Sequence, residues 1–165
     1  MPDDGIVIRS FTPADEAACQ ALYHEGAAGG LIAPNDTGLD IDDIQMAYMT
    51  PPGNHFWVAV GAKRDVVGMI GVMHSDGVGE IRRLRVAEAH QRRGIGSRLL
   101  EKALTFCREQ NYLKVALDTV VDREPAMKLF GKYHFRHGKS RRYSGKELMY
   151  FYLDLYSGET KDANG

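Results

Sequence analysis

One short stretch of the chain, HQRRGIGSRLL at residues 90–100, combines three features that suit an anionic ligand. Two arginines, Arg92 and Arg93, precede two glycines spaced one residue apart, and the residues that follow turn apolar. The start of a helix presents unpaired backbone N–H groups and the positive end of the helix dipole. Glycines let a ligand approach the backbone closely. The stretch therefore predicts a binding turn for a phosphate-bearing ligand.

Two familiar phosphate-binding motifs do not match this stretch. The P-loop pattern G-x-x-x-x-G-K-[ST] occurs nowhere in the chain. The dinucleotide pattern G-x-G-x-x-G fails because Leu99 stands in place of its last glycine. Asp118 lies at about the distance of that motif's acidic residue, but inside a strand pattern. The antiparallel strands expected before the stretch also disagree with a doubly wound nucleotide fold.

The elements around the stretch predict a mixed α/β fold. Apolar residues recur every four positions from Ile95 to Cys107, which predicts a helix. The other helices are expected in residues 12–27, LDIDDIQMAYM and REPAMKLFGKY. Strands are expected at GIVIRSF, HFWVAVG, VVGMIGVMH, GEIRRLRV, LKVALDTVV and ELMYFYLDL. Short links make the second to fourth strands antiparallel, and the strand–helix–strand unit after them requires a parallel, right-handed crossover.

The composition is that of an ordinary globular protein. The chain has 165 residues, of which 44% are hydrophobic and 26% charged, with a net charge of −1. We expect one domain over residues 1–156 and a disordered tail over residues 157–165. The acidic N-terminus lacks the order of a signal peptide, and the longest apolar stretch is too short to span a bilayer. These features favour a cytoplasmic protein that contacts no membrane.

The two cysteines, Cys19 and Cys107, lie among apolar residues in segments expected to be helical. We expect both to be small core side chains in a reducing compartment. The chain has no CxxC and no Cys/His ligand spacing, so no metal site is expected.

The segment RLRVAEAHQRRGIGSRLLEKAL resembles the acetyl-coenzyme-A-binding motif of the GNAT N-acetyltransferase superfamily, Q/R-x-x-G-x-G/A between a strand and a helix. LKVALDTVV followed by EPAMKLFGKYHF is similar to the family's next strand and its A-x-x-L-Y-x-x-x-G-F helix. The expected element order matches the family from about Ile6 to Leu155. The resemblance implies a central mixed, mostly antiparallel sheet with helices on both faces. It also implies direct transfer of an acetyl group from acetyl-CoA, as cosubstrate, to a primary amine.

The resemblance assigns residues to the cosubstrate. The backbone of Leu84, Arg85 and Val86 would pair with the pantetheine arm, on a strand that the family usually bulges. The segment from Gln91 to Ser97 would hold the pyrophosphate, and its members are Gln91, Arg92, Arg93, Gly94, Ile95, Gly96 and Ser97.

Three positions depart from the family pattern. Phe130 replaces the usual tyrosine that protonates the departing thiolate, and we expect it to pack against the sulfur end of the cosubstrate. His134 replaces a glycine, and Arg123 replaces an asparagine that is often present. Tyr133 is the nearest substitute acid, with water as the alternative.

Glu80 is the candidate general base. It opens the strand EIRRLRV eleven residues before Gln91, the position and spacing of the base in some members of the family. A partly desolvated carboxylate there could take the ammonium proton directly or through water. The alternative is a structural ion pair between Glu80 and Arg82 or Arg85.

The sequence leaves the acceptor and two other function classes open. The acidic residues Asp36, Asp40, Asp42 and Asp43 could attract a cationic amine. Conversely, Arg82, Arg83 or Arg85 could hold the carboxylate of an amino-acid-like acceptor. A small amine is favoured over a protein or peptide acceptor, and a homodimer is compatible with the sequence. The other classes are a coenzyme-A-binding module without catalysis and a nucleic-acid-binding protein, which the acidic first third of the chain disfavours.

Overall fold

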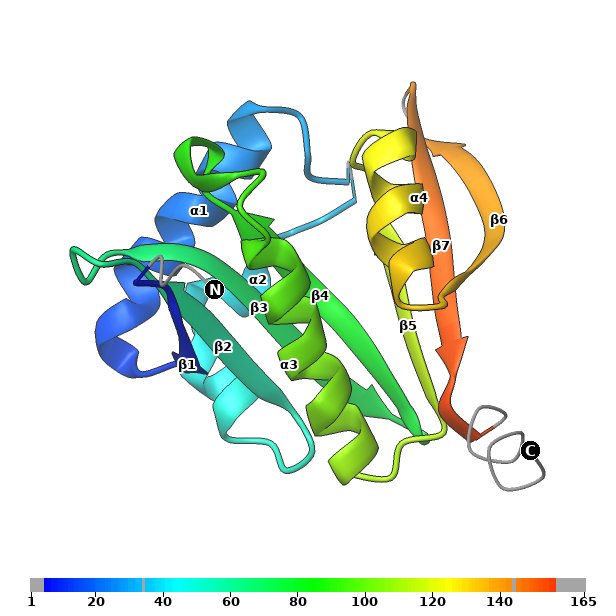
Figure 1. Cartoon of the computed structure of the whole chain (residues 1–165), viewed down its shortest axis with the longest axis horizontal. Helices are drawn as coiled ribbons and strands as arrows, with labels where there is room; N and C mark the ends of the chain where they lie inside the picture. The colour runs from blue at the N-terminus through cyan, green and yellow to red at the C-terminus, as the bar shows by residue number, and fades with distance from the viewer. Residues whose placement is uncertain (1–4, 34, 144, 157–165) are drawn as a thin grey trace.

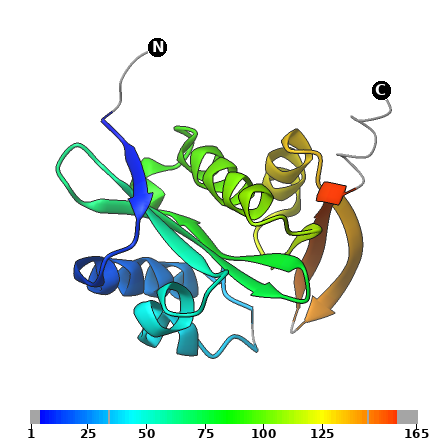
Figure 2. The same ribbon diagram turned by 90° about the horizontal axis from the view of Figure 1, so that it is seen from below.

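The computed structural model describes residues 5–33, 35–143 and 145–156, which form a seven-stranded sheet with helices on both faces (Figures 1 and 2). The strand order is β1-β2-β3-β4-β5-β7-β6. The strands are β1 Val7–Ser10, β2 His55–Val60, β3 Val66–Ser75, β4 Val78–Val86, β5 Lys114–Thr119, β6 Arg136–Tyr143 and β7 Lys146–Asp154. The helices are α1 Glu16–Ala28, α2 Leu39–Asp42, α3 Ile95–Glu109 and α4 Arg123–Lys132, with short turns η1 Pro13–Asp15, η2 Gln45–Met49 and η3 Glu88–His90. The expected fold class is confirmed.

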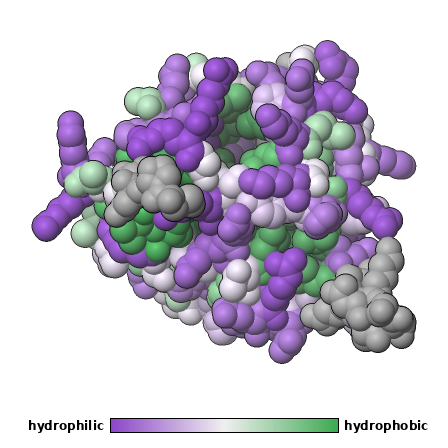
Figure 3. Space-filling view, viewed as in Figure 1, coloured by the Kyte–Doolittle hydropathy of each residue, from purple (hydrophilic) through white to green (hydrophobic). Residues whose placement is uncertain are grey.

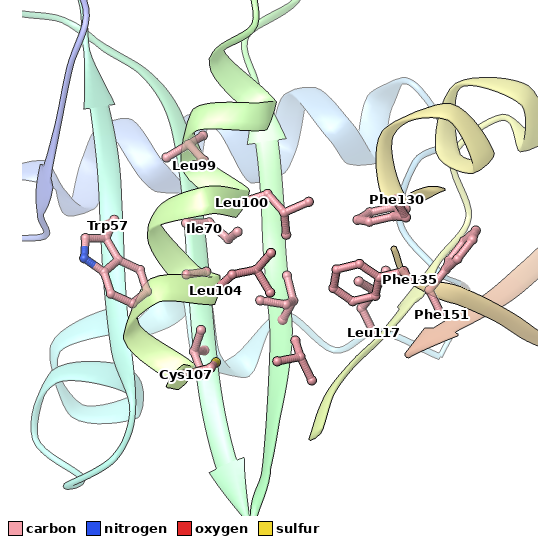
Figure 4. Close-up of a cluster of buried hydrophobic side chains, with 14 of the residues drawn as sticks. Trp57, Ile70, Leu99, Leu100, Leu104, Cys107, Leu117, Phe130, Phe135 and Phe151 are labelled. Atoms are coloured by element: carbon pink, nitrogen blue, oxygen red, sulfur yellow. The ribbon is translucent and has the colours of Figure 1, made fainter. Parts of the chain in front are cut away.

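Two apolar clusters hold the helices against the sheet. Under α3 the predicted stripe is fully buried, with Leu99 and Cys107 both at 0% exposure. Figure 4 shows these side chains on one side and Phe130, Phe135 and Phe151, below α4, on the other. On the opposite face, α1, α2 and η2 cover a second cluster that includes Ile44 and Tyr48. Burial of apolar surface on both faces therefore fixes the sheet between two helical layers.

Strands β4 and β5 are parallel neighbours that separate along their length. Their pairing covers only Val78, Gly79 and Glu80 on β4 and Lys114, Val115 and Ala116 on β5. Beyond Glu80 the two strands diverge, as Figure 1 shows between the labels β4 and β5. The remainder of β4 thus has an edge that β5 does not use for hydrogen bonds.

Strand β6 corrects the expected element order, which had no strand between α4 and the last strand. Residues Arg136–Tyr143 form it by antiparallel pairing with β7 at the edge of the sheet. Its sequence, RHGKSRRY, is basic and polar and has no alternation of apolar residues. Edge strands commonly carry such charges, which discourage pairing with other chains.

Both cysteines are buried, as expected. Cys19 and Cys107 are free thiols at 0% exposure, and burial raises the pKa of each to about 12. They act as core side chains and not as reactive thiols.

Two further expectations concern the C-terminal tail and membrane-spanning segments. The tail expected over residues 157–165 lies outside the described residues. In the part of the chain that the structure does describe, no helix combines the length and apolar character needed to cross a membrane.

Candidate active site

A cavity of about 780 Å³ opens where β4 and β5 diverge. Its walls are the second half of β4, the end of β5, the start of α3, one side of α4 and the segment after α1. Figure 3 shows apolar side chains in the hollow between α3 and α4. The volume is in the range of small-molecule and cofactor sites.

The arginine–glycine turn has the backbone geometry of an anion site. Arg92 and Gly94 both have left-handed backbone, with φ of 65° and 79°. Such residues within a turn point successive N–H groups into one concavity. Helix α3 begins directly after Gly94, and no side chain caps its first turn. The turn predicted to bind phosphate therefore leads into a helix start without a side-chain cap, and its backbone geometry is compatible with converging amides.

Most of the residues assigned to the cosubstrate meet at this cavity. The ones that line it are Leu84, Arg85, Val86, Gln91, Arg92, Gly94, Ile95, Gly96 and Phe130. Arg93 and Ser97 are absent from the lining. The Arg93 guanidinium bonds the ring of His90 at 2.9 Å, and the Ser97 carbonyl accepts a hydrogen bond from Tyr133 at 3.4 Å.

We expect Gly96→Val to weaken acetyl-CoA binding at least ~10-fold without loss of folding stability. A Cβ at Gly96 would meet Val86 Cγ2 at 3.7 Å, an ordinary contact, so the added bulk fills ligand space and not core. Arg93→Ala should weaken binding by ~1–3 kcal/mol if its charge acts on the phosphates. Calorimetric titration with acetyl-CoA measures both. Arg108→Ala, at the far end of α3, is the matched control. Unchanged affinity in both variants would contradict the assignment of this turn.

Strand β4 carries the bulge that the family resemblance led us to expect. Met69 of β3 lies opposite Arg85 and Gly71 lies opposite Arg82, so two β4 residues face the single residue between them. Arg83 takes up the extra length with φ of 60°. Bulges re-aim side chains next to active sites, and this one lies at the cavity wall.

Arg83 is the centre of a charge network between β4 and the segment after α1. Its guanidinium bonds the carboxylates of Asp36 and Asp40 and lies 4.9 Å from the centre of the Tyr23 ring. The Tyr48 hydroxyl also donates to Asp40, at 2.5 Å. Burial is the largest influence and would raise the pKa of both carboxyls. Together, the hydrogen bonds and charge of Arg83 and a further hydrogen bond, from Gly38 to Asp36 and from Tyr48 to Asp40, outweigh it and hold both pKa values below their ordinary values.

This network changes the expected electrostatics of the acceptor side. Two of the four acidic residues expected to attract a cation, Asp36 and Asp40, are both paired with Arg83, whose single charge offsets one of the two. Arg83 itself, one of the arginines considered for a ligand carboxylate, is occupied by carboxylates of its own chain. Asp42 and Asp43 are exposed and do not line the cavity.

Glu80 lies in the cavity wall at the last pair of residues before β4 and β5 diverge. Its carboxylate accepts a hydrogen bond from Arg82 Nε at 2.5 Å, and both side chains are about 40% exposed, 41% and 42%. The ion pair considered from the sequence is thus present. It also leaves the carboxylate partly exposed in the cavity wall, where a proton acceptor must be.

Two further charged residues, Asp118 and Arg141, lie in the cavity wall. No role in acetyl transfer was predicted for either from the sequence, and Asp118 was considered only as the acidic residue of a dinucleotide motif. Burial and the charge of Glu80 raise the pKa of Asp118 above its ordinary value. The sequence KVALDT does contain a signal for Asp118. Successive side chains of a strand point to opposite faces, so Asp118 must point away from the face of the buried Leu117. Arg141 lies on the strand that the sequence did not predict.

Phe130 and Tyr133, near the C-terminal end of α4, have different surroundings. Phe130 is 3% exposed, lines the cavity and packs against Phe151 with ring centres 4.9 Å apart. The Tyr133 hydroxyl donates to Glu101 on α3 at 2.5 Å and is outside the cavity lining. Burial and this hydrogen bond raise the pKa of Tyr133. His134 has φ of 69°, which explains why a glycine is usual at this position of the motif.

Arg85 is a buried cation with weak compensation, and we expect Arg85→Met to raise the free energy of unfolding by ~1–2 kcal/mol. Its side chain is 11% exposed, Nε has no hydrogen-bond partner, and the Glu25 carboxylate is 3.9 Å away. Burial accordingly lowers the pKa of Arg85. Because the assigned role of Arg85 is made by its backbone, acetyl-CoA affinity should not change. Urea denaturation and calorimetry measure the two quantities; a destabilised or non-binding variant would show that the guanidinium itself is required.

Comparisons with known proteins agree with this geometry. Residues 18–135 match the family model described as Acetyltransferase (GNAT) family. N-acetylaspartate synthetase from Homo sapiens is 37% identical over 107 residues, 63% of this chain and 35% of that protein. N-acetyltransferase 8 from Homo sapiens is 34% identical over 103 residues, 59% of this chain and 45% of that protein. The matched region is thus less than half the length of these two relatives.

The solved structures show the same fold at low sequence identity. A GCN5-related N-acetyltransferase from Kribbella flavida superimposes with a TM-score of 0.79 at 20% identity, over 93% of this chain and 100% of that one. The family model covers most of the described residues, including β4, the arginine–glycine turn and α4. The chain belongs to the GNAT acetyltransferase family.

Proposed function

We propose that the protein is an N-acetyltransferase that moves an acetyl group from acetyl-CoA directly to the primary amine of a small acceptor. The observation that carries this proposal is one continuous cavity that joins an anion-binding turn to the gap between β4 and β5. A carboxylate, Glu80, stands at the closed end of that gap. Family membership supports the same chemistry.

The residues present fit acetyl-CoA, which supplies an activated acetyl thioester. Beyond Glu80, the β4 edge that faces the gap is free of β5 and can pair with an extended pantetheine arm, as an added strand would. The amides around Gly94 and the start of α3 suit the pyrophosphate. The exposed Arg92 adds positive charge at the same end of the cavity.

The chain's own residues then have separate tasks. Glu80 takes the proton that an ammonium group must lose before its nitrogen can attack. Arg82 holds the Glu80 carboxylate in one orientation through their 2.5 Å hydrogen bond. Phe130 keeps water away from the apolar wall of the cavity.

A small acceptor fits the way the acceptor side is enclosed. The Lys146 ammonium, at the start of β7, donates a hydrogen bond to the carbonyl of Gly30, after α1. This contact joins two segments that border the cavity, and we infer that it restricts the entry of a polypeptide. The name of one human relative, N-acetylaspartate synthetase, also supports an amino-acid-like acceptor.

The proposal is tested by release of free thiol from acetyl-CoA over a panel of primary amines, amino acids and N-terminal peptides. We expect acetylation of small amines, identified by mass spectrometry, and little turnover of peptides. Tight acetyl-CoA binding without transfer to any amine would instead favour a binding module.

The absence of the usual tyrosine should have a small kinetic effect. Because a thiol with a pKa near ~8.5 leaves readily as thiolate at neutral pH, Phe130→Tyr should raise kcat only a few-fold. Tyr133→Phe should lower kcat less than ~10-fold, the lower reach of acid catalysis. Steady-state kinetics at saturating acetyl-CoA measures both. A hundred-fold gain from Phe130→Tyr would indicate a lineage that has lost its catalysis.

A further inference from the structure

Four side chains from β5, β6 and β7 share one face of the sheet. Asp118 lies directly opposite Tyr150, and Arg141 lies directly opposite Leu148. Directly opposite residues of an antiparallel pair point to the same face, as do residues two apart on one strand. These four side chains therefore lie on the face away from α4, whose core contains Leu117, Met149 and Phe151.

The same face closes the acceptor side of the cavity. Asp118, Arg141 and Leu148 line the large cavity, and they also line a smaller neighbouring one. Tyr150 forms part of the smaller cavity, where Gly138 leaves room for its ring, since a Cβ there would lie 2.7 Å from Tyr150 Cδ2. Asp118 and Arg141 thus lie in the wall that the two cavities share.

Asp118 and Arg141 differ from the other charged strand residues of the cavity wall. Glu80 pairs with Arg82, and Arg83 pairs with two aspartates. Arg85 is buried against α1 near Glu25. Within the described part of the chain, the side chains of Asp118 and Arg141 have neither a hydrogen bond nor a direct ion pair, although the charge of Arg141 acts on Asp118. Both side chains belong to exposed residues, so a ligand can reach them.

We propose that Asp118 and Arg141 form the acceptor subsite, which recognises an amino acid by its ammonium and carboxylate groups. This inference rests on the proposed acetyltransferase function. One carboxylate and one guanidinium that are close but not bonded complement a zwitterion, whose opposite charges are similarly close. Arg141 binds the acceptor carboxylate, and Asp118 holds the ammonium group beside Glu80.

The transfer balances with these groups in place. The ammonium group loses one proton to Glu80 before its nitrogen attacks and a second after the N–C bond has formed. The bond between the acetyl carbon and sulfur breaks. One of the two protons ends on the thiol of coenzyme A, and the other passes to solvent.

The test compares amines that differ only by a carboxylate. For each standard L-amino acid accepted, kcat/KM is measured beside its decarboxylated amine, for example L-alanine beside ethylamine. We expect the wild-type protein to prefer the amino acid by at least ~10-fold. Arg141→Met should raise the KM for the amino acid by roughly 10- to 100-fold and remove the preference, with acetyl-CoA affinity unchanged. Asp118→Asn should raise KM for both members of a pair.

Arg142→Met provides the matched control. Arg142 follows Arg141 on β6 but faces the α4 side of the sheet, opposite Glu147, and lines neither cavity. Its replacement removes the same charge and should leave the preference intact. Equal effects of the two arginine variants, or equal use of amines with and without a carboxylate, would overturn the subsite.

A binding measurement separates this proposal from the proposed function. Calorimetric titration of the accepted or best-bound L-amino acid into the protein saturated with coenzyme A needs no chemistry. Binding that Arg141→Met abolishes, without any acetyl transfer by the wild type, would contradict the enzyme but retain the subsite. Acetyl transfer without a carboxylate preference would retain the enzyme and contradict the subsite.

Discussion

Replacing Glu80 by glutamine should lower kcat/KM for acetyl transfer by ~10²–10⁴-fold, with acetyl-CoA affinity nearly unchanged. The substitution keeps the size of the side chain and its place in the cavity wall. It removes the group that accepts the ammonium proton, so the neutral amine must come from solution. At high pH, where more of the acceptor is already neutral, the deficit should shrink. Steady-state kinetics over a pH range, with the best amine of the panel, measures the effect.

The ion pair with Arg82 requires a second variant, because Glu80→Gln also weakens that contact. Arg82→Met breaks the same pair but leaves the carboxylate in place. If Glu80 is the proton acceptor, Arg82→Met should reduce kcat/KM far less than Glu80→Gln. Equal losses of kcat/KM in the two variants would mean that the ion pair has a structural role. A fully active Glu80→Gln variant would mean that another residue or water accepts the ammonium proton.

The sequence was most informative where a feature is built from one continuous segment. The helix from Ile95 to Glu109 was predicted because its buried side, including Leu99 and Leu104, repeats with helical spacing. The turn before it, with left-handed backbone at Arg92 and Gly94, was also located from the sequence, and its role in anion binding stays a prediction. All of its parts, the arginines, the glycines and the helix start, lie within a few residues of one another.

The sequence was least informative about solvated strands and distant pairs. Strand β6 lies at the sheet edge, so its residues need no apolar alternation, and its partner β7 holds it by backbone hydrogen bonds. Asp118 and Arg141 become neighbours only through their separate pairing with β7. Arg83 meets Asp36 across 47 positions of sequence. None of these relations has a local pattern that could reveal it.

Among single charged residues, Arg83 should contribute most to the free energy of unfolding. The side chains of Arg83, Asp36 and Asp40 are only 11%, 18% and 11% exposed. Removal of one partner from a buried pair leaves the others buried without compensation, which typically costs ~3–5 kcal/mol. Arg83 also spans the strand bulge and the segment after α1, so its loss should loosen the acceptor side as well.

We therefore expect Arg83→Met to lower the free energy of unfolding by ~3–5 kcal/mol near neutral pH. In the wild type, the lowered pKa values of Asp36 and Asp40 add stability above the ordinary carboxyl value of about 3.9, and this stability is lost as the pH falls below it. Without Arg83, burial is opposed mainly by the hydrogen bonds from Gly38 and Tyr48, so the pKa values of the two carboxyls rise and they take up protons at a higher pH. The deficit of the variant should therefore shrink between pH 7 and pH 4. Urea denaturation at both pH values measures it, with Arg142→Met as a surface control. A deficit that is independent of pH would show that Arg83 stabilises the fold by packing and not by charge.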